Sequence, residues 1–586
     1  MTKEERDKRE AEKRARMEGS PDIGGVTLPF SRNSLLKAFW ALAAFYPAYM
    51  LRTARGDINF ETLFAGSVLF VACMLPGWLW CTGRIQGLPI FPLFALGFLP
   101  TYVTPLWQGH SALAQYTANE INTAAWTVAG FLLIGQLFWQ QMAVRAVGVP
   151  HAVRMIDLKK SGKILIVCLF FEVVFELIQI LLWQHMAGGV SAIRGFATAA
   201  GRMGIFVFSY QLGQGELKPG IKFTFLTLLV VLIIQETASL LLANVLPTLG
   251  IAFAAYVLGS GKIPWKALAT TVVCISVLHA GKYEMRDNYL EKPRPGFLDL
   301  PGFFTEWVGL GIKNLGMGKK EEEIRETSSA AQRASLLQVM MKVQANTPDK
   351  ISYLQGETYA FIPSLLIPRV LSPKKTVAHL GNMMLALRYG FVTEESMWFV
   401  SVAFDPIIEA YANYGFVAVA VLAVVFGFFI GWATRLTIHV PMLSFGFLFG
   451  VQVVAASIAS FNTTAVYITS VWQAFLALVA MSFVLMRKGN NPVWKYYALK
   501  LAEKLRRKGP DPKLQKTLEE VNSVLAKDER QKDIGYGISD MGGEKAKDGG
   551  QESVVSGRPT SISENPSTVQ QKHERPTRFV YGEKKK

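Results

Sequence analysis

The stretch YANYGFVAVAVLAVVFGFFIGWAT (411–434) decides the class of fold. It contains no Asp, Glu, Lys or Arg. A helix needs about 20 predominantly apolar residues to cross the hydrocarbon core of a bilayer, and this stretch is long enough. Apolar runs in the core helices of soluble proteins are usually shorter. The chain is therefore predicted to be a membrane protein.

The rest of the chain repeats this pattern. Of its 586 residues, 51% are hydrophobic and 18% are charged, whereas about 25% of residues are charged in a soluble domain. Together with 411–434, further apolar windows predict an all-α polytopic membrane protein with about twelve transmembrane helices. The windows lie at 35–51, 63–82, 89–107, 124–142, 164–184, 196–212, 223–243, 246–260, 266–281, 411–434, 440–460 and 465–486.

The net charge of +17 indicates a membrane topology rather than a nucleic-acid partner, because the basic residues lie beside apolar windows. The N-terminal run has no apolar region typical of a signal peptide, so this end is expected to stay in the cytoplasm. Short cytoplasmic loops are rich in Lys and Arg, and the alternation places both termini inside. The outside loop 108–123 has neither residue, and the predicted cytoplasmic loops contain Arg84, residues 145–163, Lys218 with Lys222, Lys262 with Lys266, and Arg435.

These assignments divide the chain into five segments. A large extracytoplasmic helical loop separates two groups of spans, and a loop of this length is expected to be functional. The segments are a charged cytoplasmic N-terminal segment (1–34), a bundle of about nine spans (35–281), the loop with the candidate active site (282–410), three spans (411–486) and a basic, mostly disordered cytoplasmic tail (487–586).

Two parts of the loop are predicted to be helical. Ala330, Ala334, Leu337 and Met341 have helical spacing, and the sequence Asn-Thr-Pro at 346–348 ends that helix. The segment ETYAFIPSLLIPRVLSPKK (357–375) contains a proline at every fifth position from 363 to 373. Because proline interrupts a helix, this segment is expected to form short broken helices at the outer membrane interface.

Several chemistries have no motif in this sequence. The four cysteines lack the spacing of metal ligands or of a disulfide framework, and no metal site is predicted. The sequence contains no Walker loop, HExxH or GxSxG motif, and no GxGxxG after a strand, so no nucleotide or other cofactor is expected.

Carboxylates inside apolar windows form a separate group. Glu172 and Glu176 share one helix face because they are four residues apart, and Glu236 lies in a later window. Ionisable groups at membrane depth are candidates for function. We favour structural pairing with Arg194 or Arg202, and a proton relay is the alternative.

The loop and its flanks carry a set of motifs. These are GETYAFIPSLLIPRVLSPKK (356–375), Gly-Asn (381–382), IIEAYANYGFVAVAVLAVVFGFFIG (407–431), GKYEMR (281–286), RASLLQVMMKVQANTP (333–348) and GLPIFPLFALGFLPTYVTPLW (87–107). They resemble the Wzy-type O-antigen polymerases, which are bacterial oligosaccharide repeat-unit polymerases. In that family, an IPR-x-x-x-P-K-P-like segment precedes a Glu-x-Tyr-x-Asn-(Phe/Tyr)-Gly entry to a late span. The similarity covers residues 85–435, and the chain departs from the pattern at 373–376, where Pro-Lys-Lys-Thr replaces the second proline.

The resemblance implies a glycosyltransferase of GT-C-like architecture in the bacterial inner membrane. Such an enzyme moves a glycan from a polyprenyl diphosphate to a sugar hydroxyl of another lipid-linked unit, without a metal or cofactor. Its expected partners are polyprenyl-diphosphate-linked oligosaccharide, membrane lipids, a flippase and a chain-length regulator. The sugar, its linkage and the choice between polymerase and ligase stay open.

The resemblance also implies site residues in the loop. Arginine binds phosphate oxygens through a planar, permanently charged fork. The expected diphosphate-binding residues are Arg286, Arg333 and Arg369, which match motifs of the family, and Arg388, a further cation of the loop. The expected catalytic residues are Arg369, Glu409 and Glu357, which lie in motifs, and His379, which follows the Pro-Lys-Lys stretch. Arg369 lies in an apolar segment, where an unpaired charge is costly. Glu409, Glu357 and His379 are alternative general bases for the hydroxyl, whereas Asp405 before Pro406 is expected to cap a turn.

The competing interpretation is a glycolipid or polysaccharide exporter, or a proton-coupled transporter, without covalent chemistry. The intramembrane carboxylates favour it. However, no repeat of matching halves is apparent, and the long loop has no counterpart in the first half of the chain, which counts against many transporter architectures.

Overall fold

The structure is a computed structural model that separates into a unit of Met1–Leu525 and a unit of Ala526–Lys586. All described residues belong to the first unit. They are residues 30–54, 59–145, 148–182, 191–240, 242–289, 297–316, 335–367, 372, 376–396, 402–458, 462–491 and isolated residues between 493 and 523.

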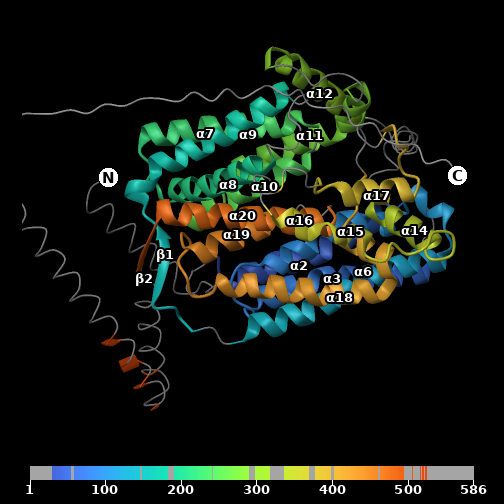
Figure 1. The fold of residues 1–586 in the computed structure, drawn as a ribbon, viewed down its shortest axis with the longest axis horizontal. Coiled ribbons are helices and arrows are strands. Elements are labelled where there is room, and N and C mark those ends of the chain that lie inside the picture. The colour runs from blue at the N-terminus through green and yellow to red at the C-terminus, as the bar shows by residue number, and fades with distance from the viewer. Residues whose placement is uncertain are drawn as a thin grey trace, which may run out of the picture. The chain divides into compact units, whose positions relative to one another are not determined.

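The first half of the chain is a series of helices (Figure 1). They are α2 (Arg32–Arg52), α3 (Phe60–Cys81), α4 (Ile90–Leu96), α5 (Thr104–Gln108), α6 (Ala118–Val144), α7 (Leu158–Leu182), α8 (Ser191–Gln214), α9 (Pro219–Ala238), α10 (Leu242–Ser260) and α11 (Trp265–Tyr289). A π-helix (Leu99–Val103) joins α4 to α5, and a 3-10 helix (Ser111–Gln115) follows α5.

The second half contains short loop helices and three long ones. After a 3-10 turn (Phe297–Asp299) come α12 (Leu300–Leu315), α14 (Leu336–Asn346), α15 (Glu357–Ala360), α16 (Ile362–Leu366), α17 (Leu380–Arg388), α18 (Pro406–Leu436), α19 (Phe445–Ile458) and α20 (Thr464–Leu485). The predicted end of the loop helix at Asn346 and the predicted break at Pro363 are confirmed. Residues 317–334, 368–371 and 373–375 lie outside the described part of the chain.

The chain is a multi-pass helical membrane protein. Each of the twelve apolar windows overlaps a helix, although the window at 89–107 is divided among α4, the π-helix and α5. Among the described residues, seven helical segments are long and apolar enough to cross a membrane. These are Arg32–Arg52, Phe60–Cys81, Ile90–Gln108, Ala118–Val144, Pro219–Ala238, Pro406–Leu436 and Thr464–Leu485.

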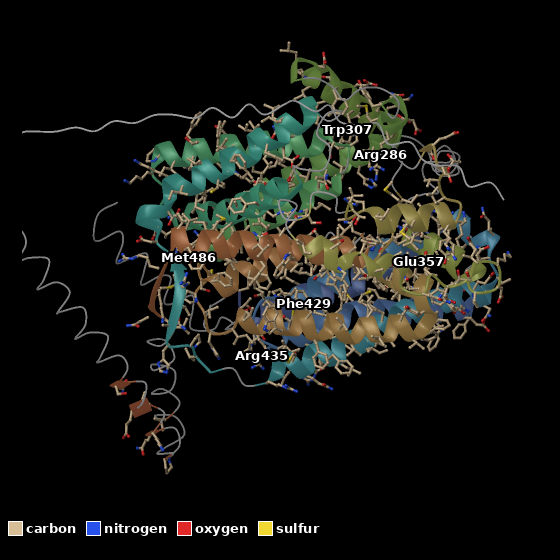
Figure 2. The ribbon with its side chains drawn as sticks, viewed as in Figure 1. Arg286, Trp307, Glu357, Phe429, Arg435 and Met486 are labelled. Carbon is tan, nitrogen blue, oxygen red and sulfur yellow. The ribbon has the colours of Figure 1, made fainter. Side chains whose placement is uncertain are left out.

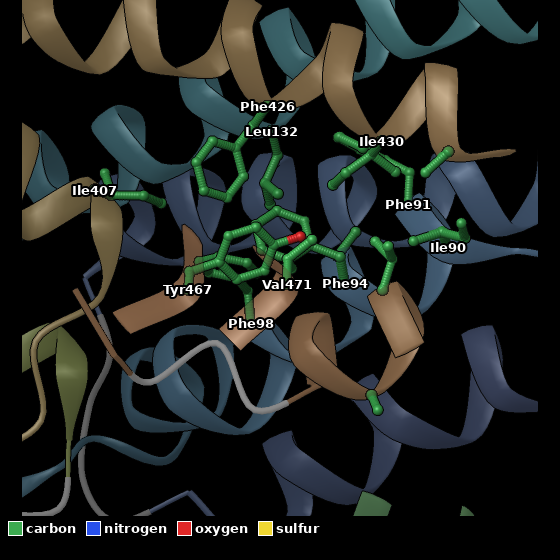
Figure 3. Close-up of a cluster of buried hydrophobic side chains, with 14 of the residues drawn as sticks. Ile90, Phe91, Phe94, Phe98, Leu132, Ile407, Phe426, Ile430, Tyr467 and Val471 are labelled. Carbon is green, nitrogen blue, oxygen red and sulfur yellow. The ribbon is translucent and has the colours of Figure 1, made fainter. Parts of the chain in front are cut away.

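The centre of the bundle is the packing of α18 against α6. A Cβ at Gly427 would lie 2.3 Å from the Gly135 carbonyl oxygen, so only glycine permits this approach of the two backbones. Aromatic rings fill the neighbouring space (Figure 3). Phe426 lies 6.0 Å from Phe94 and 5.0 Å from Tyr467, measured between ring centroids. This packing joins α4, α18 and α20 around one core.

The described residues are almost entirely helical, in agreement with the all-α prediction, and they include one short sheet. In this antiparallel sheet, β1 (Ala152–Ile156) pairs with β2 (Met486–Asn490), and Arg154 faces Lys488. The sequence predicts a cytoplasmic loop at 145–163, a span that ends at 486 and a mostly disordered tail from 487. Strands of five residues that pair across more than 300 residues leave no local signal of their partnership.

Candidate functional site

The candidate site forms where α18 breaks. Tyr414 (φ −148°, ψ 24°) and Gly415 (φ 65°, ψ −150°) are not helical, although the helix continues on both sides. Just before the break, the carbonyls of Ala412 and Asn413 accept hydrogen bonds from the backbone N–H groups of Leu354 (3.0 Å) and Gln355 (3.2 Å). The segment that leads into α15 is therefore docked on the kink of α18.

Asn413 joins these two segments through its side chain. Its Oδ1 accepts a hydrogen bond from the Gly356 N–H (2.9 Å), and its Nδ2 donates to Thr358 Oγ1 (2.8 Å) and to the Glu409 carbonyl (2.7 Å). Asn413 is fully buried. The two motifs that begin with Gly356 and Glu409, separated by about 50 residues in the sequence, thus form one hydrogen-bonded unit.

Glu409 lies inside this unit and is fully buried. Its Oε2 accepts a hydrogen bond of 2.6 Å from the backbone N–H of Thr464, the first residue of α20. A helix N-terminus favours an anion because its N–H groups and the helix dipole point toward it. Its Oε1 has no hydrogen-bond partner among the described residues.

Other buried polar atoms come from the elements around Glu409. In the described part of the chain, Asn382 Oδ1 and Thr463 Oγ1 also lack hydrogen-bond partners. A Cβ added at Gly381, near the start of α17, would lie 3.5 Å from Glu409 Oε1. The backbone of α17 therefore approaches the carboxylate closely. Buried polar groups are usually hydrogen-bonded, and a catalytic role is one explanation for those that are not.

Asp405 ties a third segment to the site. It is the N-cap of α18, as predicted, and accepts hydrogen bonds from the Ile408 N–H (2.8 Å) and from the Tyr102 hydroxyl (2.5 Å). Burial raises the pKa of the Asp405 carboxyl to about 6, although these hydrogen bonds oppose the shift. Tyr102 belongs to the early motif at 87–107, so this motif also reaches the site.

A cleft opens beside the docked segment. Its volume is about 560 Å³, and its lining residues are Leu354, Glu357, Met384, Leu387, Arg388, Thr393 and Glu394. Arg388 donates to the carbonyl oxygen (3.2 Å) and hydroxyl (3.1 Å) of Ser352. The lining contains two carboxylates, one guanidinium and three apolar side chains. Such a lining suits a polar molecule that also has apolar faces.

The structure brings together some of the predicted site residues. Glu357 and Arg388 line the cleft, and Glu409 lies behind the docked segment. His379 directly precedes α17 as its N-cap residue. Arg333 and Arg369 lie outside the described residues.

Arg286 is in another part of the molecule. Its Nε and Nη2 donate to the carbonyl oxygen of Leu240, at 3.2 and 3.1 Å. Figure 2 shows Arg286 close to Trp307, where α11 and α12 pack together, whereas Glu357 is the first residue of α15. The structure thus gives Arg286 a partner at the end of α9.

Several residues of this site are not predicted from the sequence. Asn413 and Asn382 were inside recognised motifs, and an amide at the start of an apolar window is a signal that could have identified Asn413. Thr464 lies outside every one of these motifs. Tyr102 lies inside the motif at 87–107, but like Thr464 it contacts the site through a pairing of distant segments, which has no local signal.

The intramembrane carboxylates form a second polar group, between α7, α8, α9 and α10. Thr248 donates to Glu236 Oε1 (2.9 Å), and Arg202 interacts electrostatically with both Glu172 and Glu236. Glu172 is buried, and its Oε2 has no hydrogen-bond partner among the described residues. The side chain of Arg194 is outside the described part of the structure.

Comparison with known proteins gives no relative for this chain: no family model, curated protein or solved structure matches it. The fold and the site define a multi-pass helical membrane protein with a buried carboxylate beside an open polar cleft.

Proposed function

We propose that this protein is an inner-membrane glycosyltransferase that polymerises or transfers polyprenyl-diphosphate-linked oligosaccharide in bacterial surface polysaccharide biosynthesis. One observation carries the proposal. The two motifs that most resemble those of the Wzy-type polymerases are hydrogen-bonded to each other through Asn413, and an open cleft lies beside them. Neither their separation in the sequence nor their composition requires this contact.

The cleft supports the assignment of a carbohydrate ligand. Sugars combine many hydroxyl groups with apolar ring faces. The hydroxyl groups can donate to the carboxylates of Glu357 and Glu394, and the ring faces can contact the apolar lining residues of the cleft. The acceptor hydroxyl is placed here, with Glu357 as the general base because its carboxylate lines the cleft. Glu409 is fully buried, and we assign it a positioning role at the N-terminus of α20.

The proposed reaction is a displacement at the anomeric carbon of the donor. The acceptor oxygen forms the new C–O bond, the bond to the diphosphate oxygen breaks, and the acceptor proton passes to Glu357. Arg369 and Arg333 are proposed to stabilise the negative charge on the leaving diphosphate. Arg388 already donates a hydrogen bond to the Ser352 carbonyl, and its side chain lines the cleft.

The proposed topology follows from the direction of two helices. Both α18 and α20 begin at the site, at Asp405 and Thr464, and end beside the basic sheet, at Arg435 and Met486. A helix of 31 residues is about 45 Å long, so the site and the sheet lie at opposite membrane faces. The positive-inside rule then supports an extracytoplasmic site and cytoplasmic termini. Twelve spans in a GT-C-like arrangement belong to the same proposal.

The test is incubation of the purified protein with lipid-diphosphate oligosaccharide, followed by gel analysis of chain length. We expect longer chains on the lipid carrier. The activity is expected to survive EDTA, because the proposed arginines stabilise the diphosphate without a metal. Loss of activity in EDTA that magnesium or manganese restores would contradict the metal-free mechanism.

A transporter or exporter is the second candidate. Glu172 interacts electrostatically with Glu236 and Arg202, and its Oε2 has no hydrogen-bond partner in the part of the chain that the structure describes. These features favour a transporter, since such groups are used in proton relays. The same reconstituted protein distinguishes the two functions. An exporter changes only the side of the membrane on which the glycolipid lies, whereas the proposed enzyme changes its length.

A further inference from the structure

The sheet at the cytoplasmic end is held firmly by its neighbours. The Ile156 N–H donates to the Leu443 carbonyl (3.0 Å), and the Asp157 N–H donates to the Leu485 carbonyl (3.1 Å). The Asn491 N–H donates to the His151 carbonyl (3.0 Å). Side chains on β1 and β2 are therefore presented from a fixed backbone.

Two of these side chains have the same charge and face each other. Arg154 and Lys488 are directly opposite in the antiparallel register, and both are exposed. Like charges at directly opposed positions destabilise a sheet. Asp157 is the single acidic residue in 145–163, 435–444 and 486–491, and its carboxylate pairs with Arg487 at 3.6 Å. An anion from outside the chain would relieve the repulsion between Arg154 and Lys488.

An apolar surface leads directly to this pair. The guanidinium of Arg154 lies over the ring of Phe483, 4.9 Å from its centroid. Phe483 is 71% exposed and the adjacent Val484 is 69% exposed. Leu476 and Ala480 extend the same exposed face along α20. In a transmembrane helix such a face contacts acyl chains, which places Arg154 at the depth of the lipid headgroups.

We propose that Arg154 and Lys488 bind the phosphate of an anionic phospholipid whose acyl chains lie along the exposed face of α20. The ligand is a lipid rather than free phosphate because the cationic pair adjoins the apolar face. Anionic lipids are enriched in the cytoplasmic leaflet, where basic groups near the surface attract them. This inference does not depend on the glycosyltransferase activity.

The test is lipid binding by the full-length protein in detergent, measured by native mass spectrometry with phosphatidylglycerol and with phosphatidylcholine. Each basic residue near a membrane surface contributes about 1 kcal/mol to binding. Arg154→Gln combined with Lys488→Gln should therefore weaken phosphatidylglycerol binding about thirtyfold. The control, Lys313→Gln with Lys350→Gln, removes two exposed basic residues of the extracytoplasmic loop and should leave binding unchanged.

A second variant separates lost binding from lost folding. Arg154→Lys with Lys488→Arg keeps both charges, and we expect it to retain most of the affinity. Equal binding of phosphatidylglycerol by the wild type and the double Gln variant would overturn the proposal. So would equal affinity for the two lipids, failure of the exchanged pair to bind, or displacement of the lipid by glycerol phosphate at similar concentrations, which would indicate a site for a free anion.

Discussion

At the scale of single residues, the two glutamates of the site have different environments. Glu357 lines the cleft, whereas Glu409 is buried against the first N–H of α20. Glu357→Gln should lower kcat about a hundredfold or more because it removes the base. Glu409→Gln should retain most of kcat, since a glutamine oxygen can still accept from Thr464.

The measurement is chain elongation by purified protein at matched amounts of folded protein. An active Glu357→Gln enzyme together with an inactive, folded Glu409→Gln enzyme would reverse the assignment.

The raised pKa of Asp405 predicts a stability effect. Its folded-state pKa is about 6 instead of 3.8, so the folded protein binds the proton more tightly than the unfolded chain does. The stabilisation from protonation is complete below about pH 4 and is lost as the pH rises through 6. At 1.36 kcal/mol per pKa unit this amounts to about 3 kcal/mol.

Asp405→Asn should abolish this dependence. Relative to the wild type, the variant should gain stability between pH 4 and pH 7, measured by unfolding in detergent. Asp349→Asn, at an exposed position, is the control and should behave like the wild type. A constant stability difference between wild type and Asp405→Asn over this pH range would show that Asp405 does not titrate as described.

A residue of the site can be predicted when it lies in a local sequence motif, and it cannot when it reaches the site only through the packing of distant helices. The sequence predicts Glu357 and Glu409 from short motifs and Arg388 from its charge in the loop, and the structure places Glu357 and Arg388 together. The sequence does not predict Thr464 and Tyr102, because they reach the site from other helices. Their threonine and tyrosine side chains are ordinary in a membrane span, so only the fold reveals their contacts.

At the scale of elements, the kink of α18 depends on Gly415. Its φ of 65° and ψ of −150° belong to a region that essentially only glycine occupies. A Cβ there would also lie 2.8 Å from the hydroxyl oxygen of Tyr353. Gly415→Ala should therefore destabilise the protein by about 1–3 kcal/mol and disturb the docking of the segment before α15.

Thermal unfolding and elongation activity measure this effect. Gly130→Ala is the matched control, because a Cβ at Gly130 meets no atom within 4 Å in the structure. The control should be as stable as the wild type or slightly more stable, since alanine favours a helix. If Gly415→Ala unfolds at the wild-type temperature and remains active, the kink does not hold the site.

The helices themselves could be predicted better than their packing. Apolar windows and prolines are local signals, so the helices and the breaks of the loop segment followed from them. The paired strands and the close contact of Gly427 with Gly135 are long-range features, which single-sequence periodicity does not contain. The kink at Gly415 falls within an uninterrupted apolar window, where hydropathy predicts a continuous helix.

At the scale of the whole molecule, function and topology are coupled by α18 and α20. Each runs from the carboxylate site to the basic sheet, so the orientation of one end fixes that of the other.

Two exposed positions report on the two ends: Glu394 in the cleft and His151 before β1. In a background without the native cysteines, Glu394→Cys should react with an impermeant thiol reagent in intact spheroplasts. His151→Cys should react only after permeabilisation, because the basic end is expected to face the cytoplasm. The opposite labelling pattern would place the cleft in the cytoplasm, where a polymerase that receives exported lipid-linked units could not use it.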